Sequence, residues 1–91
     1  MAVYVDNGRW PYRGMLMSHM VADTLGELHA MADTIGIARR WYQSNASVPH
    51  YDICQAKRAK ALQAGAQPVD RRGFVEVARR VREAVKAGTW G

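Results

Sequence analysis

Apolar and polar residues alternate in short stretches of the chain, and this pattern predicts β-strands. Residues 2–5, 15–21 and 49–54 carry the β-branched, aromatic and methionine side chains typical of strands, and residues 37–42 have similar content. Because side chains alternate along a strand, we expect Val3, Val5, Tyr51 and Ile53 to face the core. In the second strand the pattern leaves two core-facing sets open: Leu16, Ser18 and Met20, or Met17, His19 and Val21.

Apolar residues three and four positions apart predict three helices. The first begins after Asp23 or Thr24, either of which can cap it, and ends before Gly36. The second covers residues 55–64, which are rich in Ala, Lys, Arg and Gln, and the third begins after Asp70 as an amphipathic helix. We expect residues 88–91 to be loose unless Trp90 docks.

These elements predict an α/β domain, with α+β as the alternative, in which a sheet of about three to five strands packs with about three helices. A chain of 91 residues has room for one compact domain. We assign residues 1–69 to its core, and residues 70–91 to a basic helix packed on the same domain.

The charge balance is basic: 13 Lys and Arg face 8 Asp and Glu, which gives a net charge of +5. This charge favours polyanions such as nucleic acid or a phosphorylated ligand, although it also serves solubility alone. Cys54 is the single cysteine, which excludes an internal disulfide, and the apolar runs are too short to cross a membrane. We therefore expect a cytoplasmic protein without a membrane association.

The stretch from His50 to Asp52 carries candidate chemistry. Alternation places His50 and Asp52 on one strand face, and the first strand brings Asp6 to the same surface. A histidine beside a carboxylate can act as an acid–base pair, so the catalytic candidates are His50, Asp52 and Asp6. The residues leave open whether the protein is an enzyme; if it is one, we expect phosphoester or nucleotide chemistry.

Basic and aromatic side chains supply the binding candidates. In residues 7–14, which have loop composition, arginines can contact a phosphate and aromatic rings can stack on a base or sugar. Trp10 and Tyr12 can equally cap an open edge of the core. The ligand-binding candidates are Arg9, Tyr12, Arg13, His19, Arg39, Arg40, Lys57 and Arg58. We therefore expect a face of His, Asp and Arg residues that binds a nucleotide or nucleic acid.

Two alternatives stay open. His19, His50, Asp6 and Asp52 have the donor atoms that suit zinc or manganese, but they come from separate segments without a compact metal motif. We therefore predict no cofactor, with a divalent metal as the alternative. The exposed tryptophans and methionines also fit a homodimer or a non-catalytic partner in protein–protein interaction.

Several blocks of the sequence, taken in order, resemble a known family. The blocks are Val3-Tyr4-Val5-Asp6, Arg9-Trp10-Pro11-Tyr12-Arg13-Gly14, Ser18-His19, Ala22-Asp23, Glu27-Leu28-His29, Arg39-Arg40-Trp41-Tyr42-Gln43, His50-Tyr51-Asp52, Arg58 and Gly65-Ala66. The family comprises small bacterial and phage proteins and is known as domain of unknown function 4031. The resemblance covers residues 2–69 and leaves the last helix outside. It implies a compact α/β domain and says little about chemistry.

Overall fold

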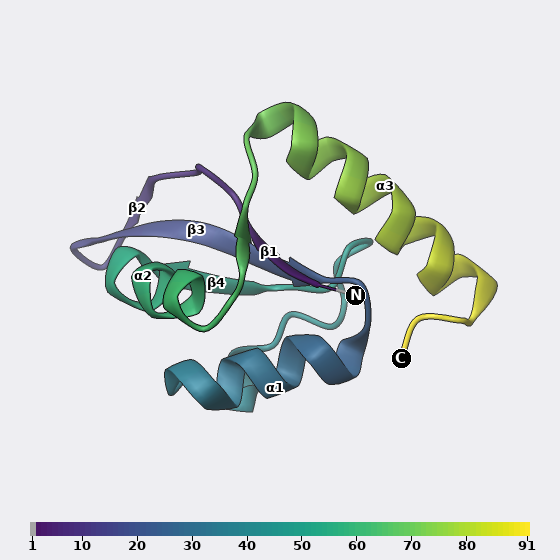
Figure 1. The fold of residues 1–91 in the computed structure, drawn as a ribbon, viewed down its shortest axis with the longest axis horizontal. Helices are drawn as coiled ribbons and strands as arrows, with labels where there is room; N and C mark the ends of the chain where they lie inside the picture. Colours follow the sequence, from purple (N-terminus) through teal and green to yellow (C-terminus); the bar gives the residue numbers. More distant parts are fainter. Residues whose placement is uncertain (1) are drawn as a thin grey trace.

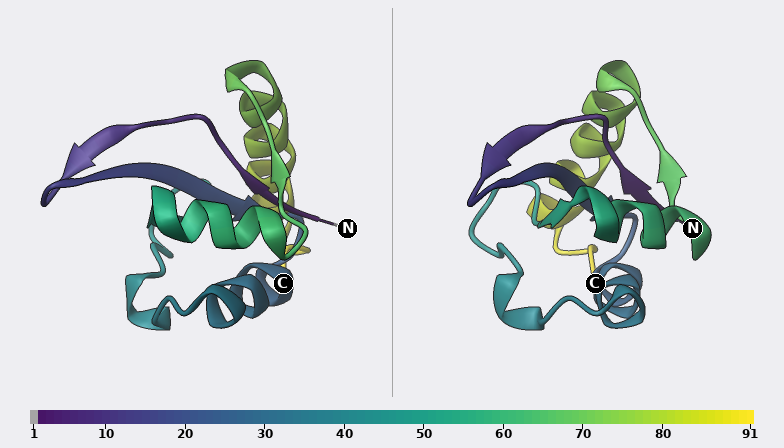
Figure 2. Two further views of the ribbon diagram at one scale, coloured as in Figure 1. Left: turned by 60° about the vertical axis from the view of Figure 1, so that its left-hand side comes forward. Right: turned by 90° about the vertical axis from the view of Figure 1, so that its left-hand side faces the viewer.

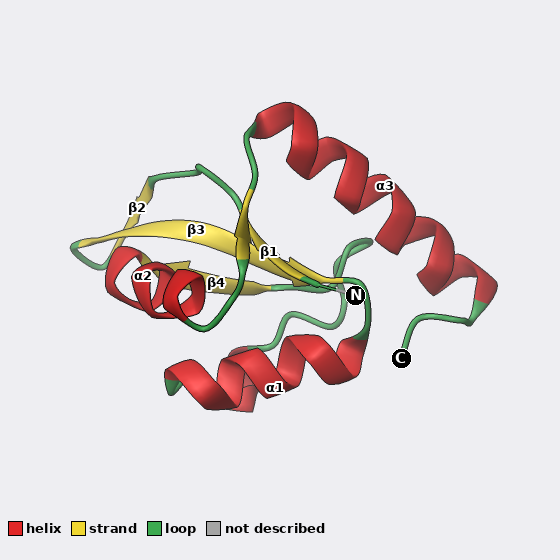
Figure 3. Ribbon diagram, viewed as in Figure 1, coloured by secondary structure: helices red, strands yellow, loops and turns green. Residues whose placement is uncertain are grey.

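Strand β3 (Met15–Ala22) is the centre of the sheet in this computed structural model, which describes residues 2–91. β1 (Val3–Val5) and β2 (Trp10–Tyr12) pair antiparallel along one edge of β3, and β4 (Tyr51–Cys54) pairs antiparallel along the other. β5 (Gln67–Pro68) adds to β1 in parallel (Figure 1). The result is a mixed sheet of five strands with three helices (Figure 3), so the predicted α/β class is confirmed.

Helices α1 (Leu25–Ile35) and α2 (Gln55–Gln63) cover one face of the sheet (Figure 2). The predicted core side is confirmed, because Val3, Val5, Tyr51 and Ile53 are all buried against these helices. Met20 and Ala22 of β3 join them. The open choice in β3 is thereby settled: the Met20 side faces α1 and α2, and the His19 side faces away from them.

Helix α3 (Arg71–Ala87) lies on the opposite face and covers only the end of the sheet near Val21 (Figure 1). Val77 and Val81 pack on Val21 in a small second cluster. The rest of α3 is charged, with Arg79 paired to both Glu76 and Glu83. Among residues 2–91, no helix is both long enough and apolar enough to cross a bilayer.

The helix ends follow the expected capping chemistry. Thr24, not Asp23, caps α1, because its hydroxyl accepts a hydrogen bond from the Glu27 amide at 3.2 Å. Gly36 ends that helix in the left-handed conformation. Asp23 has a different role: its carboxylate accepts hydrogen bonds from the Ala2 amide at 2.9 Å and the Tyr4 hydroxyl at 3.2 Å. It therefore fastens the first strand beside the end of β3.

Two local predictions are wrong. Residues 37–42 do not form a strand; they contain the 3₁₀ turn η1 (Arg39–Trp41), in which the Trp41 and Tyr42 amides donate to the Ala38 and Arg39 carbonyl oxygens and not to a neighbouring strand. Conversely, residues 7–14 are not only loop, since they include β2. Arg13 and Gly14 have φ angles of 50° and 77° and form the two-residue turn of a hairpin. Pro11 fits because β2 lies at the edge of the sheet.

The C-terminal segment is docked. Trp90 packs against both hydrophobic clusters, and its indole Nε1 donates a hydrogen bond to the Ala22 carbonyl oxygen at 3.2 Å. The amide of Gly26 also donates to the carbonyl oxygen of Gly91 at 3.3 Å. These contacts join the end of the chain to the α1 end of the sheet.

Replacing Trp90 with alanine tests this docking. Because the change removes a half-buried ring and a hydrogen bond, Trp90→Ala should lower the free energy of unfolding by about 2–4 kcal/mol. Trp41→Ala is the matched control: Trp41 is 53% exposed, so its loss should cost less than about 0.5 kcal/mol. Urea denaturation followed by circular dichroism measures both values. Equal losses in the two variants would contradict the docking of Trp90.

Candidate functional site

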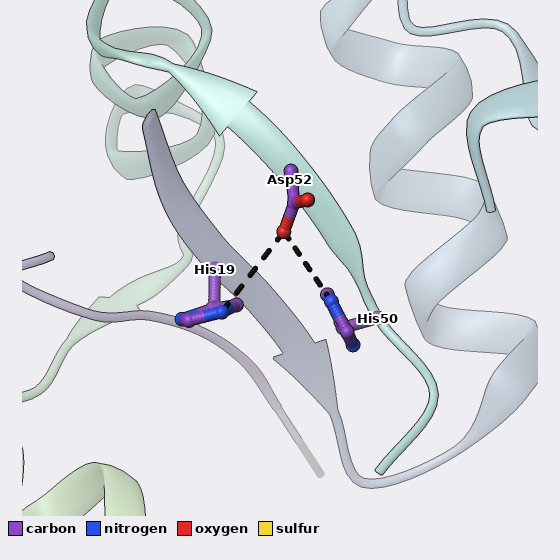
Figure 4. Close-up of side chains that lie close together, drawn as sticks. All are labelled: His19, His50 and Asp52. Carbon is purple, nitrogen blue, oxygen red and sulfur yellow. Dashed lines mark ion pairs between the residues drawn. The ribbon is translucent and has the colours of Figure 1, made fainter. Parts of the chain in front are cut away.

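The register of three strands aligns Asp6, His19 and Asp52 in one row. β3 and β4 place His19 directly opposite Asp52. On the other edge of β3 the last pair is Val5 with Met20, and the Asp6 amide next donates a hydrogen bond to the His19 carbonyl oxygen at 3.1 Å. His50 lies two residues before Asp52 and so points to the same face. Figure 4 shows His19, His50 and Asp52 turned toward one another.

Asp6 fixes the orientation of His19. One carboxylate oxygen of Asp6, Oδ1, accepts hydrogen bonds from the backbone amides of His19 at 2.8 Å and Gly8 at 3.1 Å. The other, Oδ2, lies 2.7 Å from Nδ1 of the His19 ring. Burial alone raises the pKa of Asp6, but the hydrogen bonds from His19 and Gly8 outweigh it and hold the pKa below its ordinary value. Since a carboxylate accepts, His19 Nδ1 carries a proton.

The same reasoning fixes the proton of His50. Its Nδ1 lies 2.8 Å from the carbonyl oxygen of Val48, which can only accept a hydrogen bond, so Nδ1 is protonated. In the neutral imidazole, Nε2 then carries a lone pair. Both rings therefore present Nε2 to Oδ1 of Asp52, at 3.3 Å from His50 and 4.0 Å from His19.

The Asp52 oxygen that lies near both nitrogens is buried. Its Oδ1 is inaccessible to solvent and accepts no hydrogen bond from any residue that the structure describes. Its other oxygen, Oδ2, accepts a hydrogen bond from the side-chain amide of Gln43, whose backbone forms a β-bridge with His50. Three potential electron-pair donors, His19 Nε2, His50 Nε2 and Asp52 Oδ1, thus lie within 4.8 Å of one another. We call these three residues the His/Asp cluster.

Aromatic rings enclose His19. Its ring lies 4.3 Å from the Trp10 ring and 5.3 Å from the Phe74 ring of α3, between centroids. The His50 ring approaches its edge at 5.1 Å. About a third of the His19 side chain stays exposed, against 16% of the His50 side chain. His19 is therefore packed between aromatic rings and remains reachable from solvent.

A pocket of about 570 Å³ lies beside the cluster. Its walls come from the β2–β3 hairpin, from the segment around η1, from β4 and from α2. They carry four aromatic rings and three cationic groups: Trp10, Tyr12, Trp41, Tyr42, Arg13, Arg40 and Lys57. Asp52 is the acidic residue in this lining, so it belongs to both the pocket and the His/Asp cluster.

The structure brings the three catalytic candidates and His19 together, with pairings that the sequence does not define. Asp6 contacts His19, whereas His50 contacts Asp52. Asp6 is also the most enclosed of them, with 11% of its side chain exposed. Asp6 therefore orients the His19 ring through its contact with Nδ1, while Asp52 lies at the pocket.

Four binding candidates line the pocket: Tyr12, Arg13, Arg40 and Lys57. The guanidinium groups of the two arginines lie over the rings of their neighbours, Arg13 over Tyr12 at 5.3 Å and Arg40 over Trp41 at 5.4 Å. Lys57 also donates a hydrogen bond to the Ile35 carbonyl oxygen at 2.9 Å, at the end of α1. Its ammonium group is thus held in place at the pocket wall.

The four other binding candidates lie outside the lining of this pocket: His19 belongs to the His/Asp cluster, and the remaining three are arginines. Arg39 forms an exposed ion pair with Asp33 at 2.9 Å. Arg58 donates hydrogen bonds to the Asp6 carbonyl oxygen at 2.9 Å and to the Asn7 side chain at 3.2 Å. It therefore joins α2 to the segment after β1. Arg9 is exposed in that segment.

Phe74 and Gln43 are among the contributors to the site that are absent from the sequence-based prediction. Phe74 is part of the apolar stripe of α3, and nothing in that stripe distinguishes the residue that reaches His19. Gln43 lies in a polar stretch without a pattern, and its contact with Asp52 depends on the β-bridge to His50. Both contacts follow from tertiary packing, for which the sequence carries no local signal.

The sequence matches a family model described as "Protein of unknown function (DUF4031)" over residues 3–88. The chain belongs to the DUF4031 family. The match includes α3, which the resemblance noted in the sequence leaves outside, and it includes every residue of the His/Asp cluster. No curated protein and no solved structure matches this DUF4031 chain.

Replacing Asp6 with asparagine in this DUF4031 protein should move the proton of His19. Two backbone amides hold the side-chain oxygen at the Oδ1 position, so the new NH₂ group faces His19 Nδ1 and donates to it. Neutral His19 should then carry its proton on Nε2. Imidazole ¹⁵N chemical shifts at alkaline pH distinguish the two tautomers.

His50 provides the internal control, because its Nδ1 faces the Val48 carbonyl and not Asp6. Its ¹⁵N shifts should be the same in both proteins. Unchanged His19 shifts in a folded Asp6→Asn variant would contradict the assigned hydrogen bonds.

Proposed function

We propose that the pocket binds a phosphate-bearing ligand, a nucleotide or a nucleic-acid segment. The observation that carries the proposal is the composition of the pocket lining, in which four aromatic rings and three cationic groups surround the same space. Aromatic rings stack on nucleic-acid bases of every type, and one guanidinium group can bind two phosphate oxygens at once. Both requirements of a nucleotide are therefore present in one pocket.

The size and the charge of the pocket support the same ligand class. A volume of about 570 Å³ lies within the range of small-molecule sites, about 300–1,000 Å³. Arg13, Arg40 and Lys57 outnumber Asp52, so the lining is cationic. The net charge of +5 further favours the approach of an anion.

The His/Asp cluster supplies groups that can carry out acid–base chemistry on a ligand in this pocket. Asp52 lines the pocket and lies 3.3 Å from His50 Nε2, which places a histidine–carboxylate pair at the edge of the ligand space. Acid–base chemistry on a phosphoester requires such a pair within reach of the ligand. Phosphoester or nucleotide chemistry is therefore the reaction class to test once a ligand is known.

The direct test is calorimetric titration at ~50 mM salt with the four ribonucleoside monophosphates and a short single-stranded oligonucleotide. The Arg13→Ala/Arg40→Ala variant should lose at least about 10-fold in affinity, because each arginine forms a charge-assisted contact. The matched control is Arg71→Ala/Arg72→Ala, which removes two exposed arginines of α3 that lie outside the pocket lining. The net charge falls equally in both variants.

Equal losses in the two double variants would contradict a localised site and leave only general attraction by charge. Absence of binding by the unmodified protein would overturn the proposal altogether. In that case the exposed Tyr12, Met15 and Trp41 side chains of the pocket lining favour a protein partner or a second copy of the chain, which light scattering detects.

A further inference from the structure

We propose that His19, His50 and Asp52 bind one divalent transition-metal ion of the zinc class. The ligand atoms are His19 Nε2, His50 Nε2 and Asp52 Oδ1. This site goes beyond the proposed ligand pocket, and it does not depend on a nucleotide being bound.

The hydrogen bonds of the two imidazole rings and the unsatisfied oxygen of Asp52 carry the inference. The Asp6 carboxylate and the Val48 carbonyl oxygen each contact an Nδ1 atom, so in the neutral rings both Nε2 atoms present lone pairs. These nitrogens lie 3.3 Å and 4.0 Å from a carboxylate oxygen that is buried and accepts no hydrogen bond within residues 2–91. A divalent ion at the centre of these three atoms gives the buried oxygen the partner that it lacks and accepts an electron pair from each nitrogen.

The distances fit a small ion. In a tetrahedral zinc site, metal–ligand distances of about 2.0–2.1 Å place the ligand atoms about 3.3–3.4 Å apart. His50 Nε2 and Asp52 Oδ1 are already 3.3 Å apart. His19 Nε2 lies 4.0 Å from Asp52 Oδ1, about 0.7 Å beyond that spacing, and all three ligand atoms lie within 4.8 Å of one another.

The contacts behind the ligands match those of protein metal centres. A metal-binding histidine commonly donates its other ring N–H to a carboxylate or a backbone carbonyl, which fixes the tautomer. Asp6 is the carboxylate for His19, and Val48 supplies the carbonyl for His50. Gln43 holds the second oxygen of Asp52. All three ligands are therefore oriented before any ion arrives.

Three protein ligands leave coordination positions for other molecules, as catalytic zinc sites do. Because Asp52 also lines the pocket, an ion held by it lies at the pocket edge. Two imidazoles and one carboxylate select zinc, cobalt or iron over magnesium, which prefers oxygen ligands.

The test uses the full chain without a histidine tag, freed of metal with a chelator and titrated with zinc chloride. One equivalent of Zn²⁺ should bind, Co²⁺ should give visible absorption bands of a tetrahedral or five-coordinate centre, and Mg²⁺ should not compete. His50→Gln and Asp52→Asn should each weaken Zn²⁺ binding at least about 100-fold.

Matched controls separate the cluster from other metal-binding groups. His29→Gln changes a histidine on the opposite face of the sheet, where His29 contacts the Tyr51 hydroxyl. Asp33→Asn changes an exposed carboxylate on α1. Both controls should bind Zn²⁺ within about two-fold of the unmodified protein. Circular dichroism confirms that each variant is folded.

Asp6→Asn adds a readout that a purely structural role would not change. It should keep the fold but weaken Zn²⁺ binding about 10- to 100-fold, since the Nε2 proton must first leave. No stoichiometric binding by the unmodified protein, or equal losses in the cluster and control variants, would overturn the metal site. The cluster would then be an internal ion pair. A protein that binds Zn²⁺ but no nucleotide would retain this inference and lose the proposed ligand.

Discussion

The register of β3 against its two neighbours is the constraint on which the candidate site depends. β1 and β4 flank β3 so that Asp6, His19 and Asp52 follow one another across three strands on one face. A slip by one residue in either pairing would turn the facing side chains to the other side of the sheet. The same register buries Val5, Met20 and Tyr51 on the opposite face, where α1 and α2 pack. Packing on one face therefore fixes which polar side chains lie next to one another on the other face.

The two faces of the sheet carry different tasks. The α1 and α2 side holds the larger hydrophobic cluster, whereas α3 covers only the part of the other face around Val21. The uncovered part carries the His/Asp cluster, and Asp52 links that cluster to the pocket, whose lining also includes Ile53 and Lys57 from the α1 and α2 side. Phe74 of α3 and Trp10 of β2 contact His19 at the boundary between the covered and the open region. The site thus lies where the packing of one face ends.

Much of the fold follows from local patterns, but the site needs tertiary information. Alternation correctly places Val3, Val5, Tyr51 and Ile53 in the core, and it puts His50 and Asp52 on the other face. β2 is not recognisable from the sequence, because it contains Pro11 and ends at a turn in which Arg13 has a positive φ, a conformation that few residues other than glycine adopt. Residues 37–42 have strand-like side chains, yet the amides of Trp41 and Tyr42 form hydrogen bonds within a 3₁₀ turn. The sequence does not decide whether His19 faces the core, because both faces of β3 are rich in apolar residues. Only the pairing with β1 shows that Asp6 reaches His19 and not His50.

The central claim is that two fixed imidazoles and one buried carboxylate oxygen form a single metal site. Anomalous diffraction at the zinc absorption edge, from crystals grown with one equivalent of Zn²⁺, tests it most directly. The account predicts one strong peak within about 2.0–2.2 Å of His19 Nε2, His50 Nε2 and Asp52 Oδ1. A peak at His29, or no peak at the His/Asp cluster, would contradict it.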